Sequence, residues 1–211
     1  MPQSLTLQQL PFSQACENNQ QPILTLLTKW LPSCVHLLEI GSGTGQHSVY
    51  FANHLPHIRW QPSDQRHYLP NLQARLNLQA SPNLQPAIEL DVTQPWPQLT
   101  SNVDAIFSAN TLHIMSKTMV EAFFIGVGNL LVNAGSLVIY GPFNYQGQFT
   151  SDSNRQFNMS LQHNNPQSGI RDIEWICQLA HQQGLTIRED IAMPANNRLL
   201  HFISKPKSFN Q

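Results

Sequence analysis

The sequence predicts an α/β protein with a doubly wound, mostly parallel sheet of seven strands. Helix-like and strand-like segments alternate along the 211 residues, which is typical of parallel strands joined by helices. Several strand-like runs are apolar throughout, as strands are when helices cover both faces of their sheet. A glycine-rich turn follows the first apolar strand, at the place where open α/β sheets bind their ligands.

The helices follow from apolar spacing and from the residues that begin and end them. Residues 1–15 show no regular pattern and are expected to be irregular. Pro22 suits a helix start, and apolar residues at helical spacing follow it up to Leu31. Gly184 marks the end of the last helix. The expected helices cover residues 22–31, 46–53, 69–79, 118–132, 152–161 and 172–183.

The strands are the runs between these helices. The expected strands cover residues 35–40, 58–64, 86–90, 103–109, 136–140, 185–193 and 199–204. The last two are joined by the short segment 194–197, which predicts a hairpin and therefore an antiparallel final strand. No repeat, linker or low-complexity stretch divides the chain, so 1–211 is expected to form a single domain.

Composition excludes several classes of partner. Only 11% of residues are charged, the formal net charge is −1, and no run of Lys or Arg occurs, so neither nucleic acid nor an anionic membrane is expected to bind. Three cysteines lie far apart, which suggests a reducing, cytoplasmic compartment. The nine histidines form no metal-ligand spacing, so no metal is expected. Residues 1–21 do not resemble a signal peptide, and no apolar run reaches membrane-spanning length.

The glycine-rich turn carries the clearest functional signal. Glu39 ends the first strand, and glycines alternate after it at Gly41, Gly43 and Gly45. Gln46 occupies the place of the third glycine in a dinucleotide fingerprint, and no Lys follows as in a Walker A loop. The pattern resembles motif I of class I methyltransferases that use S-adenosylmethionine (SAM). A ligand-free strand-to-helix turn is the alternative, although three alternate glycines would then cost backbone conformational entropy on folding without a structural gain.

This resemblance implies a Rossmann-like fold and assigns roles in cofactor binding. The acid, Glu39, would help to hold the amino-acid end of SAM. The loop would pass beneath the ribose and the methionine. The loop residues expected at the cofactor are Gly41, Ser42, Gly43 and Gly45.

Two further acids follow strands. Asp64 ends the second strand about 20 residues after the glycines, where Rossmann-type sheets place an acid for the ribose hydroxyls. The alternative is that Asp64 caps the next helix. Asp91 ends the third strand, and the resemblance implies that it contacts the adenine amino group together with the backbone of Val92.

Other segments resemble one specific group, the small methyltransferase-like family of bacteria and animals long filed as a domain of unknown function. The matching segments are 40–52, 60–64, 110–114, 137–143, 169–172 and 193–197, within a likeness that covers 16–204. The resemblance implies the fold and SAM binding but no particular substrate. One departure is that Asn18-Asn19-Gln20 stands where the family tends to carry a basic Arg-Asn-Lys run. The segment therefore lacks the two positive charges with which it could bind an anionic group.

Candidate catalytic residues lie after the fourth and fifth strands. His113 is a candidate base because imidazole titrates near neutral pH, and the alternative is a structural histidine at a helix start. Asn110 would line the methionine part of SAM or the substrate. Tyr140 and Tyr145 offer hydroxyl groups, Tyr140 as a second catalytic candidate and Tyr145 as a substrate contact.

The remaining substrate candidates are polar. Arg155 and Arg171 are two of few cations, and together with Asn196 and Asn197 they could bind a carboxylate or phosphate. Surface ion pairs are the alternative for both arginines. The polar segment 147–169 is expected to act as a lid.

Three functions remain open on the sequence alone. A SAM-dependent methyltransferase of an unidentified small molecule is preferred. A SAM-binding protein that acts through interactions, with weak or no catalysis, is the second. An enzyme using a nicotinamide or another nucleotide is the third, and the glycine spacing argues against it.

Overall fold

Parallel strands dominate the sheet of the computed structural model, which describes residues 6–99 and 101–205. Its seven strands lie in the order β3-β2-β1-β4-β5-β9-β8. The parallel pairs run from β3 to β5, whereas β9 is antiparallel to both β5 and β8. The strands are β1 (His36–Ile40), β2 (Arg59–Asp64), β3 (Ile88–Glu89), β4 (Val103–Ala109), β5 (Leu131–Gly141), β8 (Leu185–Met193) and β9 (Asn197–Ser204). The predicted fold class is confirmed.

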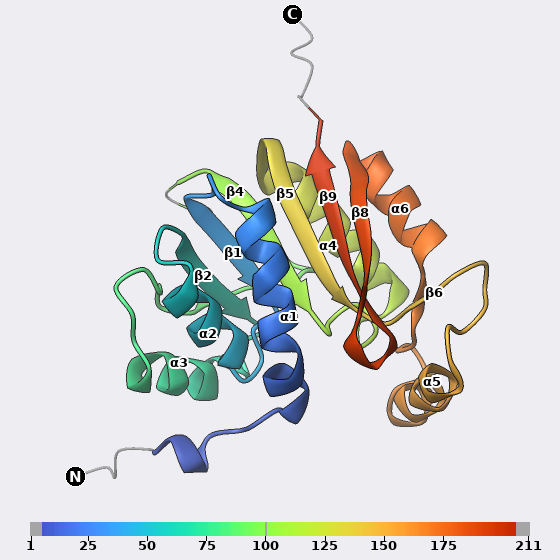
Figure 1. Ribbon diagram of the computed structural model, residues 1–211, viewed down its shortest axis with the longest axis horizontal. Helices are drawn as coiled ribbons and strands as arrows, with labels where there is room; N and C mark the ends of the chain where they lie inside the picture. The colour runs from blue at the N-terminus through green and yellow to red at the C-terminus, as the bar shows by residue number, and fades with distance from the viewer. Residues whose placement is uncertain (1–5, 100, 206–211) are drawn as a thin grey trace, which may run out of the picture.

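Helices cover both faces of this sheet. In Figure 1, α1 lies in front of the sheet and α4 behind it. Side chains of β1 alternate accordingly, because Leu37 packs with the cluster under α1 whereas Leu38 and Ile40 pack with the cluster under α4. The α-helices are α1 (Gln14–Trp30), α2 (Gln46–His54), α3 (Leu69–Leu78), α4 (Lys117–Leu130), α5 (Asp152–Asn164) and α6 (Ile173–Gln182). None of the helices in the described ranges is long and apolar enough to cross a membrane.

The first helix begins earlier than its apolar pattern predicts. The Ser13 hydroxyl accepts a hydrogen bond from the backbone of Cys16, so α1 starts at Gln14 and Pro22 lies inside it. The first two turns are polar and carry no apolar periodicity, which explains the difference. Before α1, Leu7–Gln9 form a short 3-10 helix, η1. Residues 1–5 of the expected irregular segment lie outside the described ranges.

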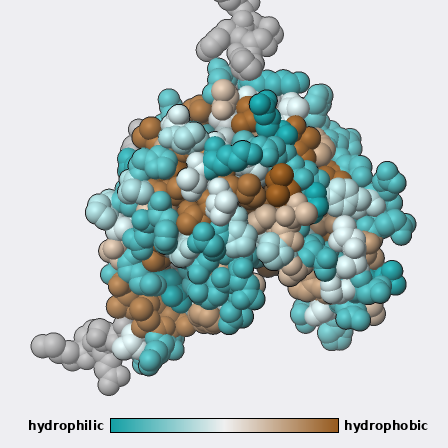
Figure 2. Space-filling model, viewed as in Figure 1, coloured by the Kyte–Doolittle hydropathy of each residue, from teal (hydrophilic) through white to brown (hydrophobic). Residues whose placement is uncertain are grey.

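The expected third strand, 86–90, is shorter in the structure and covers Ile88–Glu89. The short elements of the second half of the chain are not predicted by its pattern: β6 (Phe143–Asn144) pairs in parallel with β7 (Arg171–Asp172). A 3-10 turn, η2 (Pro194–Asn196), joins β8 to β9. Helix α5 stands at the carboxyl ends of the parallel strands, apart from the sheet (Figure 1). Viewed from the same side, the surface is hollowed between α5 and the N-terminal half of the protein (Figure 2).

Candidate functional site

A cavity of about 350 Å³ lies at the carboxyl ends of β1, β2 and β4. The start of α1, the glycine loop, the turn after β2 and the turn after β4 form its walls. This is the edge at which open α/β sheets bind ligands. Its lining includes Ser13, Cys16, Gly41, Ser42, Gly43, Thr44, His47, Asp64, Gln65, Tyr68, Leu90, Val92, Asn110, Thr111, Ile114, Met115 and Met119.

The three loop glycines all adopt left-handed backbone conformations, with φ of +74° at Gly41, +53° at Gly43 and +77° at Gly45. A Cβ at Gly41 would lie 2.4 Å from the Thr111 side chain, and one at Gly45 would lie 2.8 Å from Leu72. At Gly43, no atom of the described residues lies within 4 Å of that position. The outer two glycines therefore allow close packing, while the middle one leaves the backbone open to the cavity.

Asp64 holds this loop from the end of β2. One carboxylate oxygen accepts the backbone N–H of Gly43 at 2.6 Å, and the other accepts that of Gln65 at 2.7 Å. Burial raises the pKa of Asp64, and these two hydrogen bonds lower it. Helix α3 begins only at Leu69, so Asp64 does not cap it. The carboxylate lines the cavity and keeps further acceptor capacity there.

Glu39 is buried and is not among the residues that line the cavity. Its Oε2 accepts hydrogen bonds from the Ser48 hydroxyl at 2.5 Å and the Trp60 indole at 2.7 Å. Burial raises the pKa of Glu39 to about 7, and hydrogen bonds with Ser48, Trp60 and Ser42 act in the opposite direction. The side chain is thus a buried link between β1, β2, α2 and the glycine loop.

Of the predicted adenine and methionine contacts, Val92 and Asn110 line the cavity, and Asp91 does not. Asp91 accepts hydrogen bonds from the backbone and hydroxyl of Thr93, which close the turn after β3. Asn110 has a φ of +59°, a strained conformation for a residue other than glycine. Its backbone N–H donates to the Tyr140 carbonyl at 2.8 Å, which fixes the turn after β4.

Sequence reasoning missed the residues that bring the N-terminal segment to the cavity. Gln46 accepts the Ser13 N–H at 2.6 Å and donates to the Ser13 carbonyl at 3.2 Å. Arg75 donates to the carbonyls of Thr44 and Pro11 at 2.6 and 2.7 Å. Both side chains join segments distant in the sequence, so no local pattern reveals them. The Gln in place of the fingerprint glycine was the one available signal.

The two catalytic candidates lie beside the cavity and do not line it. The His113 ring meets Phe157 of α5 edge-on at 5.2 Å, and burial, together with the charge of Arg171, lowers its pKa to about 4. Tyr140 is buried at the end of β5, and burial raises its pKa. Hydrogen bonds with the Asn19 and Asn197 side chains act in the opposite direction on that pKa.

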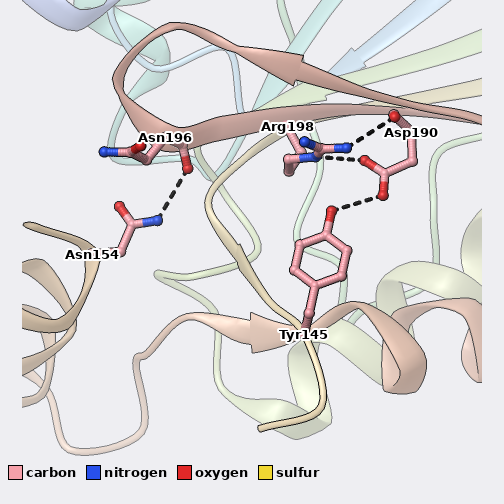
Figure 3. Close-up of polar contacts among 5 residues, drawn as sticks. All are labelled: Tyr145, Asn154, Asp190, Asn196 and Arg198. Carbon is pink, nitrogen blue, oxygen red and sulfur yellow. Dashed lines mark hydrogen bonds and ion pairs between the residues drawn. The ribbon is translucent and has the colours of Figure 1, made fainter. Parts of the chain in front are cut away.

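Tyr145 and Asn196 make structural contacts that tie the closing hairpin to the region around α5 (Figure 3). The Tyr145 hydroxyl donates to Asp190 at 2.7 Å, and Arg198 pairs with the same carboxylate at 2.7 Å. The Asn154 amide of α5 donates to the Asn196 carbonyl at 3.0 Å. Neither predicted substrate residue lies in the cavity lining.

The two arginines proposed for an anionic substrate are used elsewhere. The Arg155 side chain is 63% exposed and pairs with Asp152 of the same helix at 3.6 Å. Arg171 is buried and donates to the carbonyls of Leu112, Met115 and Gln167. It therefore braces the turn that carries His113. Within the described ranges, no group of three or more His, Cys, Asp or Glu side chains could hold a metal ion.

Comparison with known proteins identifies the family of the chain and solved structures of similar fold. A model of the family described as "Protein of unknown function (DUF938)" matches residues 10–204. An O-methyltransferase family protein from Burkholderia thailandensis superposes with a TM-score of 0.76 at 12% identity, over 89% of this chain and 57% of that one. Human N-acetylserotonin methyltransferase in complex with SAM superposes with a TM-score of 0.74 at 12% identity, over 90% of this chain and 53% of that one. An O-methyltransferase family 2 protein from Planctomyces limnophilus in complex with apigenin superposes with a TM-score of 0.77 at 15% identity, over 90% of this chain and 57% of that one.

These structural likenesses establish the fold. This chain spans little more than half the length of the three solved proteins. At 12–15% identity, the substrates and ligands of those proteins cannot be assigned to this chain, and the likeness extends only to the architecture.

Proposed function

We propose that this chain, which belongs to the family described as "Protein of unknown function (DUF938)", is a SAM-dependent methyltransferase with a small-molecule acceptor. The observation that carries the proposal is the open face of Gly43 beside the Asp64 carboxylate in one cavity. A left-handed glycine with free space above it lets a ligand contact the backbone, and a carboxylate can accept from both hydroxyls of a ribose.

The rest of the cavity suits the parts of SAM. The residues that follow β3 and β4 give the cavity a largely apolar lining, which suits the flat adenine ring. The residues from the start of α1, the glycine loop and α2 are mostly polar, which suits the amino-acid end. The apolar lining consists of Leu90, Val92, Ile114, Met115 and Met119. We keep Asp91 as a candidate for binding the adenine amino group, because its two neighbours in the sequence, Leu90 and Val92, both line the cavity.

When bound, SAM would supply an activated methyl group, whose carbon a nucleophile attacks as the bond to the positively charged sulfur breaks and S-adenosylhomocysteine leaves. The protein then has to orient the acceptor, exclude water and accept a proton where the acceptor carries one. His113 is uncharged at neutral pH and can accept a proton, and Tyr140 stands at the end of β5. We propose these two as catalytic residues, with the acceptor entering from the hollow between α5 and the N-terminal half of the protein (Figure 2).

The first test is ligand binding. Titration calorimetry should detect SAM and S-adenosylhomocysteine, with no comparable heat from NAD, because the loop lacks the third fingerprint glycine. Release of S-adenosylhomocysteine from SAM in a pool of small metabolites then reports turnover. Thermal stabilisation by NAD and by neither form of the methyl donor would contradict the proposal.

The Asp64→Ala variant should bind S-adenosylhomocysteine more weakly by about 1.5–3 kcal/mol, or roughly 10- to 150-fold, because the ribose loses a charged acceptor. Calorimetry measures the change, and thermal unfolding checks that the variant folds. Asp152→Ala, an exposed aspartate on α5, is the control and should bind as wild type does. An unchanged affinity in Asp64→Ala would mean that this carboxylate only supports the loop.

A further inference from the structure

One of the polar residues that line the cavity is a buried histidine. His47, in the first turn of α2, lines the cavity and is only 5% exposed. It stacks on Phe51 with ring centroids 5.2 Å apart and meets Phe107 edge-on, and both phenylalanines belong to the cluster under α1. Most of the apolar lining of the cavity instead joins the cluster under α4, so His47 and that lining belong to different faces of the sheet.

A hydrogen bond fixes which nitrogen of His47 carries the hydrogen. Its Nε2 lies 2.6 Å from Oδ1 of Asn19, and an amide oxygen can only accept. The amide of Asn19 is itself oriented by the Tyr140 hydroxyl, with which it forms a second hydrogen bond. Nε2 of His47 is therefore the donor, and Nδ1 presents a lone pair.

The lone pair of His47 is free for a ligand. Burial lowers the pKa of this imidazole to about 4, so the ring stays neutral near pH 7. Nδ1 has no hydrogen-bond partner among the residues that the structure describes. A neutral imidazole with one free lone pair at a ligand cavity is suited to accept a hydrogen bond from a cation.

The acid expected in this role, Glu39, is not among the residues that line the cavity, and its Oε2 accepts hydrogen bonds from Ser48 and Trp60. Building on the SAM site proposed above, we propose that His47, oriented by Asn19, accepts a hydrogen bond from the α-ammonium group of the cofactor. His47 is then a cofactor-binding residue, and Asn19 is a positioning residue that acts through it.

The test compares two ligands that differ in the group concerned. S-adenosylhomocysteine carries the amino-acid end, whereas 5′-methylthioadenosine shares the nucleoside and sulfur and lacks that end. His47→Ala should lower the affinity for S-adenosylhomocysteine by about 10- to 100-fold, as expected for the loss of a hydrogen bond to a charged group. Its affinity for 5′-methylthioadenosine should stay within about twofold of wild type. His54→Ala, an exposed histidine on the same helix, is the matched control and should change neither affinity.

A second variant covers the case in which His47→Ala does not fold. Asn19→Ala keeps the imidazole ring and removes the amide that fixes the position of its hydrogen. It should lower the affinity for S-adenosylhomocysteine by a smaller factor than His47→Ala does, and leave the affinity for 5′-methylthioadenosine unchanged. The inference is overturned if the affinities for both ligands fall together or neither changes in the folded variants. It is also overturned if His47→Ala loses turnover while it binds S-adenosylhomocysteine normally, since the ring would then serve the methyl acceptor. Wild-type protein that binds neither ligand would instead refute the SAM site itself.

Discussion

Replacing Gly43 by valine is expected to abolish binding of SAM and S-adenosylhomocysteine. The φ of Gly43 is +53°, a region that β-branched residues avoid, and the new side chain would occupy the open space above the loop. That space is where we place the cofactor, so steric exclusion adds to backbone strain. Calorimetry should show a loss of at least about 100-fold in affinity, equivalent to about 3 kcal/mol.

A matched glycine separates these two effects. Gly184 also has a left-handed backbone, with φ of +75°, and no heavy atom lies within 4 Å of its Cβ position among the described residues. It follows α6, at the amino end of β8 and far from the glycine loop in the sheet order. Gly184→Val should therefore lower the melting temperature and leave affinity unchanged. Equal loss of affinity in both variants would show that strain alone explains the result at Gly43.

The sequence was sufficient to predict the centre of the sheet because β1, β4 and most of β5 are largely apolar local runs. The glycine loop was equally visible, since its left-handed backbone demands the residue type that the pattern shows. The beginning of α1 was not predictable in the same way. Its first turns bury Asn19 and are held by Gln46, and such polar contacts across the chain leave no periodic signal.

The candidate substrate residues show the limits of reading residue types alone. Arg171 is a cation next to the site, yet three of its N–H groups donate to carbonyls of the protein. Arg155 points outward, and Arg198, which the sequence reading did not select, is paired with Asp190. The two arginines expected to bind a carboxylate or phosphate, Arg155 and Arg171, are therefore engaged with the protein itself and do not line the cavity.

Glu39 was selected as a cofactor contact, and its position in the fold leads to a different expectation. The Glu39→Gln variant should be more stable than wild type at pH 8 by about 3 kcal/mol, and equally stable near pH 4. Burial raises the pKa of this carboxyl to about 7 from 4.5, and each pKa unit is worth about 1.4 kcal/mol. The folded protein thus binds a proton that the unfolded chain releases above pH 4.5, so wild-type stability falls as pH rises towards 7.

Glutamine keeps an acceptor for Ser48 and Trp60 and carries no charge, so the stability of the variant should not decrease in this way as the pH rises. Urea unfolding of both proteins between pH 4.5 and 8 gives the difference directly. Buried His47 and His113, whose pKa values are lowered to about 4, destabilise the fold as pH decreases from 6.5 towards 4, but they do so equally in both proteins and cancel. Glu121→Gln, an exposed change on α4, is the control and should follow the wild-type curve. A stability difference that does not grow between pH 4.5 and 7 would mean that Glu39 is ionised in the fold, with its two donors compensating for its burial.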